Sequence, residues 1–89
     1  MTVRDDRAAE RFELEADGFT AFAAYHRHGD RITFIHTEVP AELEGRGIGK
    51  ALVKGALAQV RAEGLKVVPL CPFVRRYIET HPEEQDLLA

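Results

Sequence analysis

The first half of the chain carries the alternating apolar and polar pattern of β-strands that have one buried face. Phe12, Leu14 and Ala16 alternate with charged residues, and Asp17-Gly18 is a strong signal for a hairpin turn. Further strands are predicted over residues 19–26 and around Ile32, Phe34 and Ile35, separated by a turn at 28–30, and a weaker strand pattern lies at residues 2–4.

The second half changes to a helical period. Ile48, Leu52, Ala56 and Val60 form one apolar stripe, which predicts an amphipathic helix from Gly47 or Ile48 to Glu63, followed by Gly64 as a terminator. A short buried strand is expected at Val67-Val68. A second helix is expected from Pro72 or Phe73 to about His81, because Pro82 cannot continue it.

The order β-β-β-α-β-α predicts an α+β (mixed α/β) fold, with a curved, mostly antiparallel sheet and two main helices. The 89 residues are enough for a single domain over 1–89 with one modest core. A net charge of −3 supplies no basic field for nucleic acid or an anionic membrane. The single cysteine excludes an internal disulfide, and no apolar signal-peptide core begins the chain, so we expect a cytoplasmic location.

Between the third strand and the first helix lies a turn with three glycines at alternate positions, Gly45, Gly47 and Gly49. Free backbone N–H groups at a helix N-terminus converge on one point, and glycines lack the Cβ atoms that would keep an anion away. The sequence therefore predicts an anion cradle. A Walker A loop is excluded by Glu44 and Ala51, and a G-x-G-x-x-G dinucleotide loop by Lys50 and Leu52.

The segment Glu44-Gly45-Arg46-Gly47-Ile48-Gly49 resembles the Gln/Arg-x-x-Gly-x-Gly/Ala loop of the GNAT superfamily of N-acetyltransferases. The resemblance implies that acetyl-CoA is the co-substrate, with its pyrophosphate on the loop and its pantetheine arm along the preceding strand. Glu44 departs from the family pattern, and its negative charge could be offset by Arg46 and Lys50. The implied coenzyme-binding residues are Val39, Glu44, Gly45, Arg46, Gly47, Ile48, Gly49 and Lys50.

Three further segments extend this resemblance to nearly the whole chain. The stretches 36–40, 68–73 and 77–82 together are similar to the small single-domain GNAT-like proteins, which are largely uncharacterised. The resemblance implies that the coenzyme-binding half of the fold is kept and that the N-terminal helices shaping the acceptor site in larger relatives are missing.

Cys71 precedes Pro72, a favoured first residue of a helix, so the thiol is predicted at a helix N-cap. The helix dipole there stabilises a thiolate. Three alternatives stay open for Cys71: a nucleophile that carries the acetyl group, a thiol lying beside the coenzyme thiol, or a small buried hydrophobe.

The resemblance implies two further catalytic residues. Tyr77 would protonate the departing CoA thiolate, and Glu38 would take the proton of the incoming amine, with His36 as an alternative base. The competing interpretations are that Tyr77 is a core tyrosine, that Glu38 is a solvated carboxylate at a strand end, and that His36 is a hydrogen-bonded histidine within the sheet. His26 and His28 are expected near a turn, the familiar zinc spacings are missing, and no metal is predicted.

The predicted function is an acetyl-CoA-dependent N-acetyltransferase that transfers acetyl to an unidentified amine on a small molecule or a protein. The alternative is a CoA-binding or protein-interaction module with little or no catalytic activity.

Overall fold

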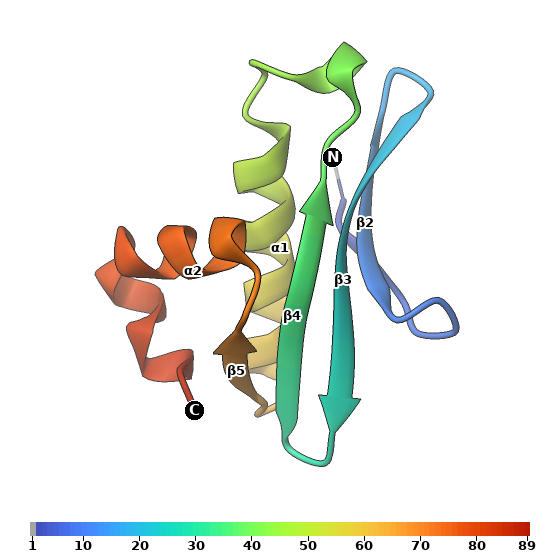
Figure 1. Ribbon diagram of the computed structural model, residues 1–89. Helices are drawn as coiled ribbons and strands as arrows, with labels where there is room; N and C mark the ends of the chain where they lie inside the picture. The colour runs from blue at the N-terminus through green and yellow to red at the C-terminus, as the bar shows by residue number, and fades with distance from the viewer. Residues whose placement is uncertain (1) are drawn as a thin grey trace.

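The computed structural model describes residues 2–89, which form one five-stranded sheet and the helices packed against it (Figure 1). In chain order the elements are β1 (Arg4–Asp6), β2 (Arg11–Ala16), β3 (Phe19–His28), β4 (Arg31–Glu38), the 3-10 helix η1 (Ala41–Leu43), α1 (Ile48–Ala62), β5 (Lys66–Pro69), α2 (Pro72–Glu79) and the 3-10 helix η2 (Pro82–Leu87).

The strands lie in the order β1-β2-β3-β4-β5. The first four are antiparallel neighbours, whereas β5 runs parallel to β4 after the crossover through α1. Helix α1 packs on β2, β3, β4 and β5, and α2 packs on β4 and β5. Within the described residues no helix covers the opposite face of the sheet, which is turned toward the viewer in Figure 1. The predicted α+β fold with a mostly antiparallel sheet is confirmed.

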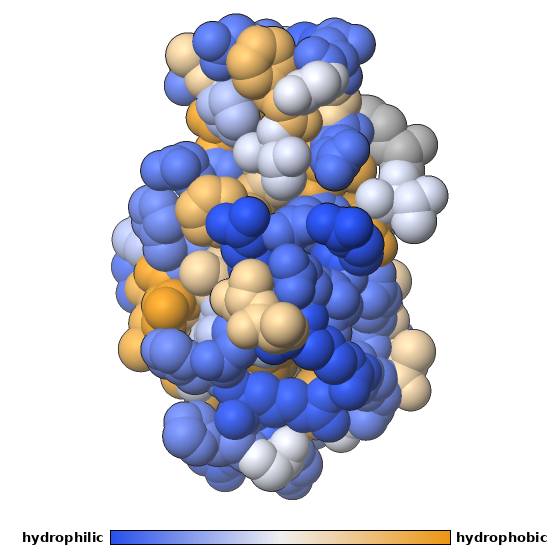
Figure 2. Space-filling model, turned by 90° about the vertical axis from the view of Figure 1, so that its right-hand side faces the viewer, coloured by the Kyte–Doolittle hydropathy of each residue, from blue (hydrophilic) through white to orange (hydrophobic). Residues whose placement is uncertain are grey.

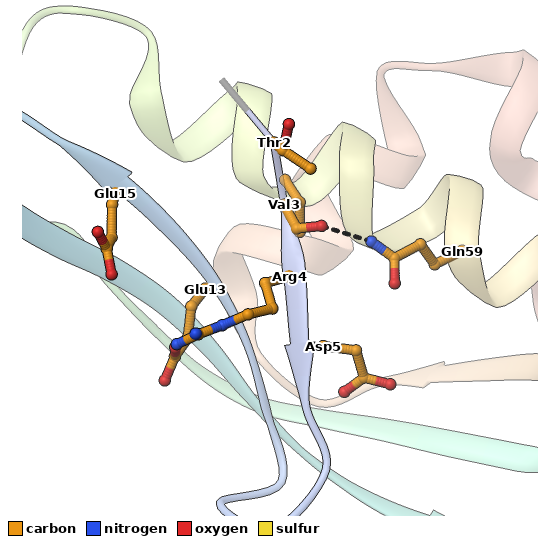
Figure 3. Close-up of a pocket in the computed structure, with 7 residues that line it drawn as sticks. All are labelled: Thr2, Val3, Arg4, Asp5, Glu13, Glu15 and Gln59. Carbon is orange, nitrogen blue, oxygen red and sulfur yellow. Dashed lines mark hydrogen bonds and ion pairs between the residues drawn. The ribbon is translucent and has the colours of Figure 1, made fainter.

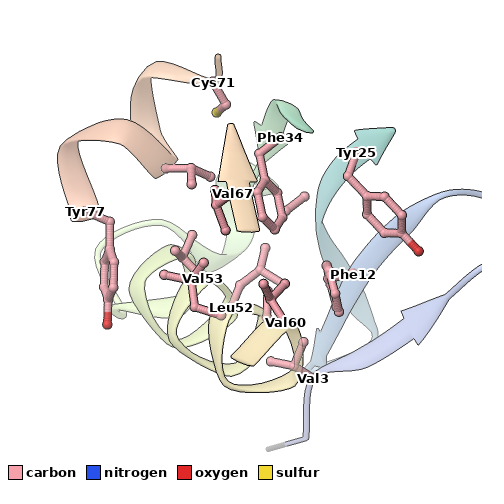
Figure 4. Close-up of a cluster of buried hydrophobic side chains, with 14 of the residues drawn as sticks. Val3, Phe12, Tyr25, Phe34, Leu52, Val53, Val60, Val67, Cys71 and Tyr77 are labelled. Atoms are coloured by element: carbon pink, nitrogen blue, oxygen red, sulfur yellow. The ribbon is translucent and has the colours of Figure 1, made fainter. Parts of the chain in front are cut away.

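The core confirms the predicted helical stripe. Ile48, Leu52, Ala56 and Val60 are each at most 2% exposed, and they pack with the inward side chains of the strands (Figure 4). The aromatic part of this core includes a contact of Phe12 with Tyr25, whose ring centroids are 5.2 Å apart, and Phe34 packs against both rings. One layer of helix on one sheet face therefore supplies the hydrophobic core.

Several predicted boundaries were wrong by a few residues. Strand β1 begins at Arg4, whereas a strand was expected over residues 2–4. Strand β3 continues to His28, so the turn that follows it contains only Gly29 and Asp30. The exposed His26 and His28 therefore lie on a strand and not in a turn. Helix α2 ends at Glu79 and not near residue 81. The Thr80 hydroxyl and the His81 ring bond the carbonyl oxygens of Arg76 and Tyr77, which closes the helix before Pro82 is reached.

A β-bulge in β4 was not predicted. Tyr25 pairs with Phe34 and Ala24 pairs with His36, so Ile35 has no partner on β3 and is 40% exposed. Because the extra residue reverses the alternation, Thr37 lies opposite the buried Ala23 on the core face. His36 and Glu38 consequently lie on the uncovered outer face, and the bulge decides which side chains of β4 reach each side of the sheet.

Val3, the residue that precedes β1, approaches Gly55 of α1 closely. A Cβ atom built on Gly55 would lie 2.8 Å from the Val3 Cβ and still closer to Val3 Cγ2. The Gln59 amide donates a hydrogen bond of 2.7 Å to the Val3 carbonyl oxygen one turn further along the helix. Gly55 therefore permits a contact that any side chain would prevent.

We predict that Gly55→Ala lowers the free energy of unfolding by about 1–2 kcal/mol, because overpacking outweighs the helix propensity gained. Urea denaturation measures the change. In a Val3→Gly background the same substitution should instead stabilise, because the three atoms nearest to the new Cβ all belong to Val3. If Gly55→Ala changes the free energy of unfolding equally in the two backgrounds, the contact between Val3 and residue 55 does not determine its effect.

Candidate functional site

The glycine turn is anchored at its start by a feature that was not predicted, the 3-10 helix η1, whose Leu43 is fully buried. Gly45 and Gly47 then have φ of +77° and +72°, which side chains rarely adopt. A Cβ atom on either would meet nothing within 4 Å, so these two glycines are required for their backbone conformation. Gly49 differs, because its Cβ would lie 2.8 Å from Phe73 Cζ.

This backbone leaves a run of amide groups without partners. Among residues 2–89, no hydrogen bond uses the N–H groups from Gly45 to Lys50, and the first bonded amide is that of Ala51, which donates to the Gly47 carbonyl at 3.0 Å. The run lies at the N-terminal end of the 15-residue helix α1, where the helix dipole is positive. The turn can therefore hold an anion, as the sequence predicts.

A hollow of about 440 Å³ opens over these amides. Seven of the eight predicted coenzyme-binding residues line it, together with Leu43 and Phe73, which the sequence did not indicate. The exception is Arg46, whose guanidinium donates to the Asp17 carboxylate in the β2–β3 turn. Glu44 is the one acidic residue and Lys50 the one cationic residue that line this hollow. Lys50 is thus the one cation that shares this lining with Glu44, whereas Arg46 is paired with Asp17 of the hairpin.

Cys71 lies at the N-cap of α2, where it was predicted, but the thiol is enclosed and only 3% exposed. Its Sγ is 3.4 Å from the Thr37 hydroxyl, and its amide N–H donates to the Phe34 carbonyl oxygen at 2.8 Å. The last paired residues of β4 and β5 are Phe34 and Pro69, so Cys71 lies where the two strands begin to part. Its chemical role stays a prediction.

Glu38 and His36 lie on the other face of the same strand. Both side chains are more than half exposed, and His36 Nε2 is 3.6 Å from Glu38 Oε1. The rings of His36 and Phe22 are in T-shaped contact, with a centroid separation of 6.0 Å. The roles of Glu38 and His36 as bases stay predictions.

Tyr77 is buried on α2 and stacks on His81, with ring centroids 3.8 Å apart. Burial, and then the charges of Glu84 and Glu83, raise the pKa of its phenol above the ordinary value, so the hydroxyl is protonated at neutral pH. A proton donor needs this form. In Figure 4 the hydroxyl is directed away from Cys71, so the structure does not bring these two predicted catalytic residues together.

A separate hollow lies at the β1 edge of the sheet, on a largely hydrophilic side of the molecule (Figures 2 and 3). Its centre is the buried Glu13, whose carboxylate bonds the guanidinium groups of Arg4 and Arg11, which lowers its pKa. Asp5 and Glu15 add two more acids to the lining. This hollow is therefore a poor site for a phosphate.

No cluster of three or more potential metal ligands occurs among residues 2–89. Over the same residues, the structure contains no helix with the length and apolar character that crossing a bilayer requires.

The family model for the GCN5-related N-acetyl-transferase matches residues 11–87. Protein NATD1 of Mus musculus is 38% identical over 90 residues, which span 98% of this chain and 82% of that protein. Protein NATD1 of Danio rerio is 30% identical with the same coverage. The solution structure of a GCN5-like protein from Staphylococcus aureus superposes with a TM-score of 0.75 at 27% identity, over 98% of this chain and 86% of that one. The chain therefore belongs to the GCN5-related N-acetyltransferase family.

Proposed function

We propose that this protein is an acetyl-CoA-dependent N-acetyltransferase that acetylates an amine. The observation that carries the proposal is the run of six unpartnered amide N–H groups from Gly45 to Lys50 at the start of α1. Such a run suits a pyrophosphate, which offers several acceptor oxygens and two negative charges. Because the chain belongs to an acetyltransferase family, the pyrophosphate of acetyl-CoA is the anion that we assign to this site.

The coenzyme would lie along the end of β4. The loop holds the pyrophosphate, and the half-buried Val39, which lines the same hollow, contacts the pantetheine arm. Beyond Val39 the core face of β4 presents Thr37 and, across from it, Cys71. We place the thioester near these two residues, because β4 extends beyond the last residue of β5 there and has no neighbouring strand on that side.

Acetyl transfer breaks the bond between carbonyl carbon and sulfur and forms one between carbon and nitrogen. The amine must lose a proton, which Glu38 accepts from the outer face, with His36 as the other candidate. The departing thiolate must gain a proton. The protonated phenol of Tyr77 is the donor that the resemblance implies, and because its hydroxyl is directed away from Cys71, we propose that it acts through an intervening water. An amine held next to the thioester needs no acyl-cysteine, so we assign Cys71 to the wall of the site.

The rival function is a CoA-binding or protein-interaction module. It is favoured by one observation: within residues 2–89 no helix covers the outer face beside Glu38, so no walled acceptor pocket is formed. A cytoplasmic location and the lack of a nucleic-acid partner are part of the main proposal, argued from the single free thiol and the net charge of −3.

The affinity for acetyl-CoA tests whether the loop binds an anion. Gly47→Asp should bind acetyl-CoA at least about tenfold more weakly than Gly47→Asn does. Asp and Asn have nearly the same shape, both tolerate the positive φ of this position, and a Cβ there meets nothing, so they differ mainly in charge. Calorimetric titration measures both affinities. Equal weakening by the two variants would contradict the anion site, and a wild-type protein that does not bind acetyl-CoA at millimolar concentration would refute both functions.

Mass spectrometry separates direct from covalent transfer. After incubation with acetyl-CoA alone we expect no acetyl adduct on Cys71, and Cys71→Ala should keep most of the turnover with an accepted amine. Glu38→Gln and Tyr77→Phe should each lower turnover by about a hundredfold while leaving coenzyme affinity nearly unchanged. A stable adduct at Cys71 that passes to the amine would overturn the direct route. Coenzyme binding without transfer to any amine in a broad screen would favour the module.

A further inference from the structure

The uncovered outer face of the sheet carries charged groups on two strands that are not neighbours. The candidate bases His36 and Glu38 lie on β4, and Arg11 lies on β2. Arg11 pairs with Ala24 of β3, and Ala24 pairs with His36, so the two charged positions are in register across β3. Two strand spacings, about 10 Å in all, separate their backbones. A small molecule that lies across β3 can therefore reach both.

The contacts of Arg11 direct its guanidinium toward β4. The guanidinium carbon lies 4.7 Å from the ring centroid of Phe22, a residue of β3 that pairs with Glu38. Its Nε donates to the Glu13 carboxylate at 2.6 Å, whereas within residues 2–89 neither of its Nη groups has a hydrogen-bond partner. The side chain is 37% exposed. Stacking on Phe22 thus fixes a guanidinium whose outer N–H groups are free to bind a ligand.

The positive charge of Arg11 is only partly neutralised by its neighbours. Glu13 is 4% exposed and bonds the guanidinium groups of both Arg4 and Arg11, so one carboxylate is shared by two cations. Asp6 lies opposite Arg11 on β1, but its carboxylate accepts a hydrogen bond from the Ala9 amide and forms no ion pair with Arg11. One positive charge is left in excess, and a carboxylate is the group that a guanidinium binds with two parallel hydrogen bonds.

An apolar surface lies between the two charged ends. Phe22 and Ala24 are the outward residues of β3 in this region, and both are half-buried. The Phe22 ring contacts both the Arg11 guanidinium and the His36 ring. A stem of methylene groups is the part of a ligand that packs favourably on such a surface.

We propose that the acceptor is an ω-amino acid, an amine with a carboxylate at the far end of an apolar stem, which lies across β3 on the outer face. Its carboxylate binds Arg11 and its stem packs on Phe22 and Ala24. Its amine then reaches Glu38 or His36. The proposal rests on the proposed function, because it takes these two residues as the bases of the acetyl transfer, and the bonds that form and break are those of that transfer. Arg11 is the residue that selects amines with a carboxylate.

The acetylation of 6-aminohexanoate and of hexylamine tests this assignment, because the two amines differ by a carboxylate in place of a methyl group. With saturating acetyl-CoA, wild type should show a kcat/KM at least about fivefold higher for 6-aminohexanoate. Arg11→Gln should bring the ratio of the two kcat/KM values close to one, whereas damage to the fold would lower both values and keep their ratio. Arg31→Gln is the matched control. Arg31 is an exposed arginine that pairs with His28 at the other end of β4, so the ratio should stay at its wild-type value.

NMR gives a second readout that needs no turnover. In the nitrogen-15-labelled protein saturated with CoA, 6-aminohexanoate should shift the Nε–H signal of Arg11 and the amide signals of Phe22 and Ala24. Hexylamine at the same concentration should leave the Arg11 signal in place.

The outcomes separate the acceptor assignment from the proposed function. If wild type acetylates both amines with equal kcat/KM, or if Arg11→Gln keeps the wild-type ratio, the assignment is wrong while the acetyltransferase function stands. If 6-aminohexanoate shifts the three signals but no amine is acetylated, the binding site is supported and the proposed function fails. If 6-aminohexanoate neither binds nor reacts, the assignment is wrong.

Discussion

Backbone amides that have no hydrogen-bond partner are tolerated only where water or a ligand can reach them, and this protein collects six of them in one place. The surrounding structure maintains that arrangement. Leu43 fixes the start of the loop in the core, Gly45 and Gly47 turn its backbone through positive φ, and Arg46 ties it to Asp17 of a distant hairpin. The loop conformation is therefore fixed by Leu43 in the core and by the ion pair of Arg46 with Asp17.

The second constraint is the parting of β4 from β5. Strand β5 ends at Pro69, which has no N–H to donate, and the Cys71 amide makes the last bond to β4, at Phe34. Strand β4 continues to Glu38 without a partner on that side. Together with the bulge at Ile35, this leaves polar side chains of β4 accessible on both faces of the sheet. Thr37 contacts Cys71 on the core side, and His36 and Glu38 lie on the uncovered side. A coenzyme and an amine could thus approach the same strand from opposite faces.

Features set by local sequence were predictable. The 3.6-residue apolar period identified α1, the glycines identified the turn that precedes it, and Cys71-Pro72 identified the start of α2, because each depends on neighbours in the chain. The resemblance to the acetyltransferase superfamily added the coenzyme, and seven of the eight residues it implied line one hollow.

Features set by tertiary contact were not predictable. No residue type marks the bulge at Ile35, because a bulge depends on the register of the neighbouring strand. Arg46 turned to Asp17 and away from the loop hollow, a contact across 29 positions of sequence. The packing of Phe73 on Gly49 and the direction of the Tyr77 hydroxyl likewise depend on how α2 lies against α1. The sequence therefore located the glycine loop and its hollow but not the arrangement of side chains around them.

The central claim is that the free amides of the loop are the anion-binding groups, and amide NMR tests it residue by residue. As coenzyme A is added to the uniformly nitrogen-15-labelled protein, the largest shift changes should fall on the amides of Gly45 to Lys50. Those amides should also exchange more slowly with solvent once the ligand is bound. Saturating coenzyme A that moves other amides while these six keep their shifts and exchange rates would contradict the account.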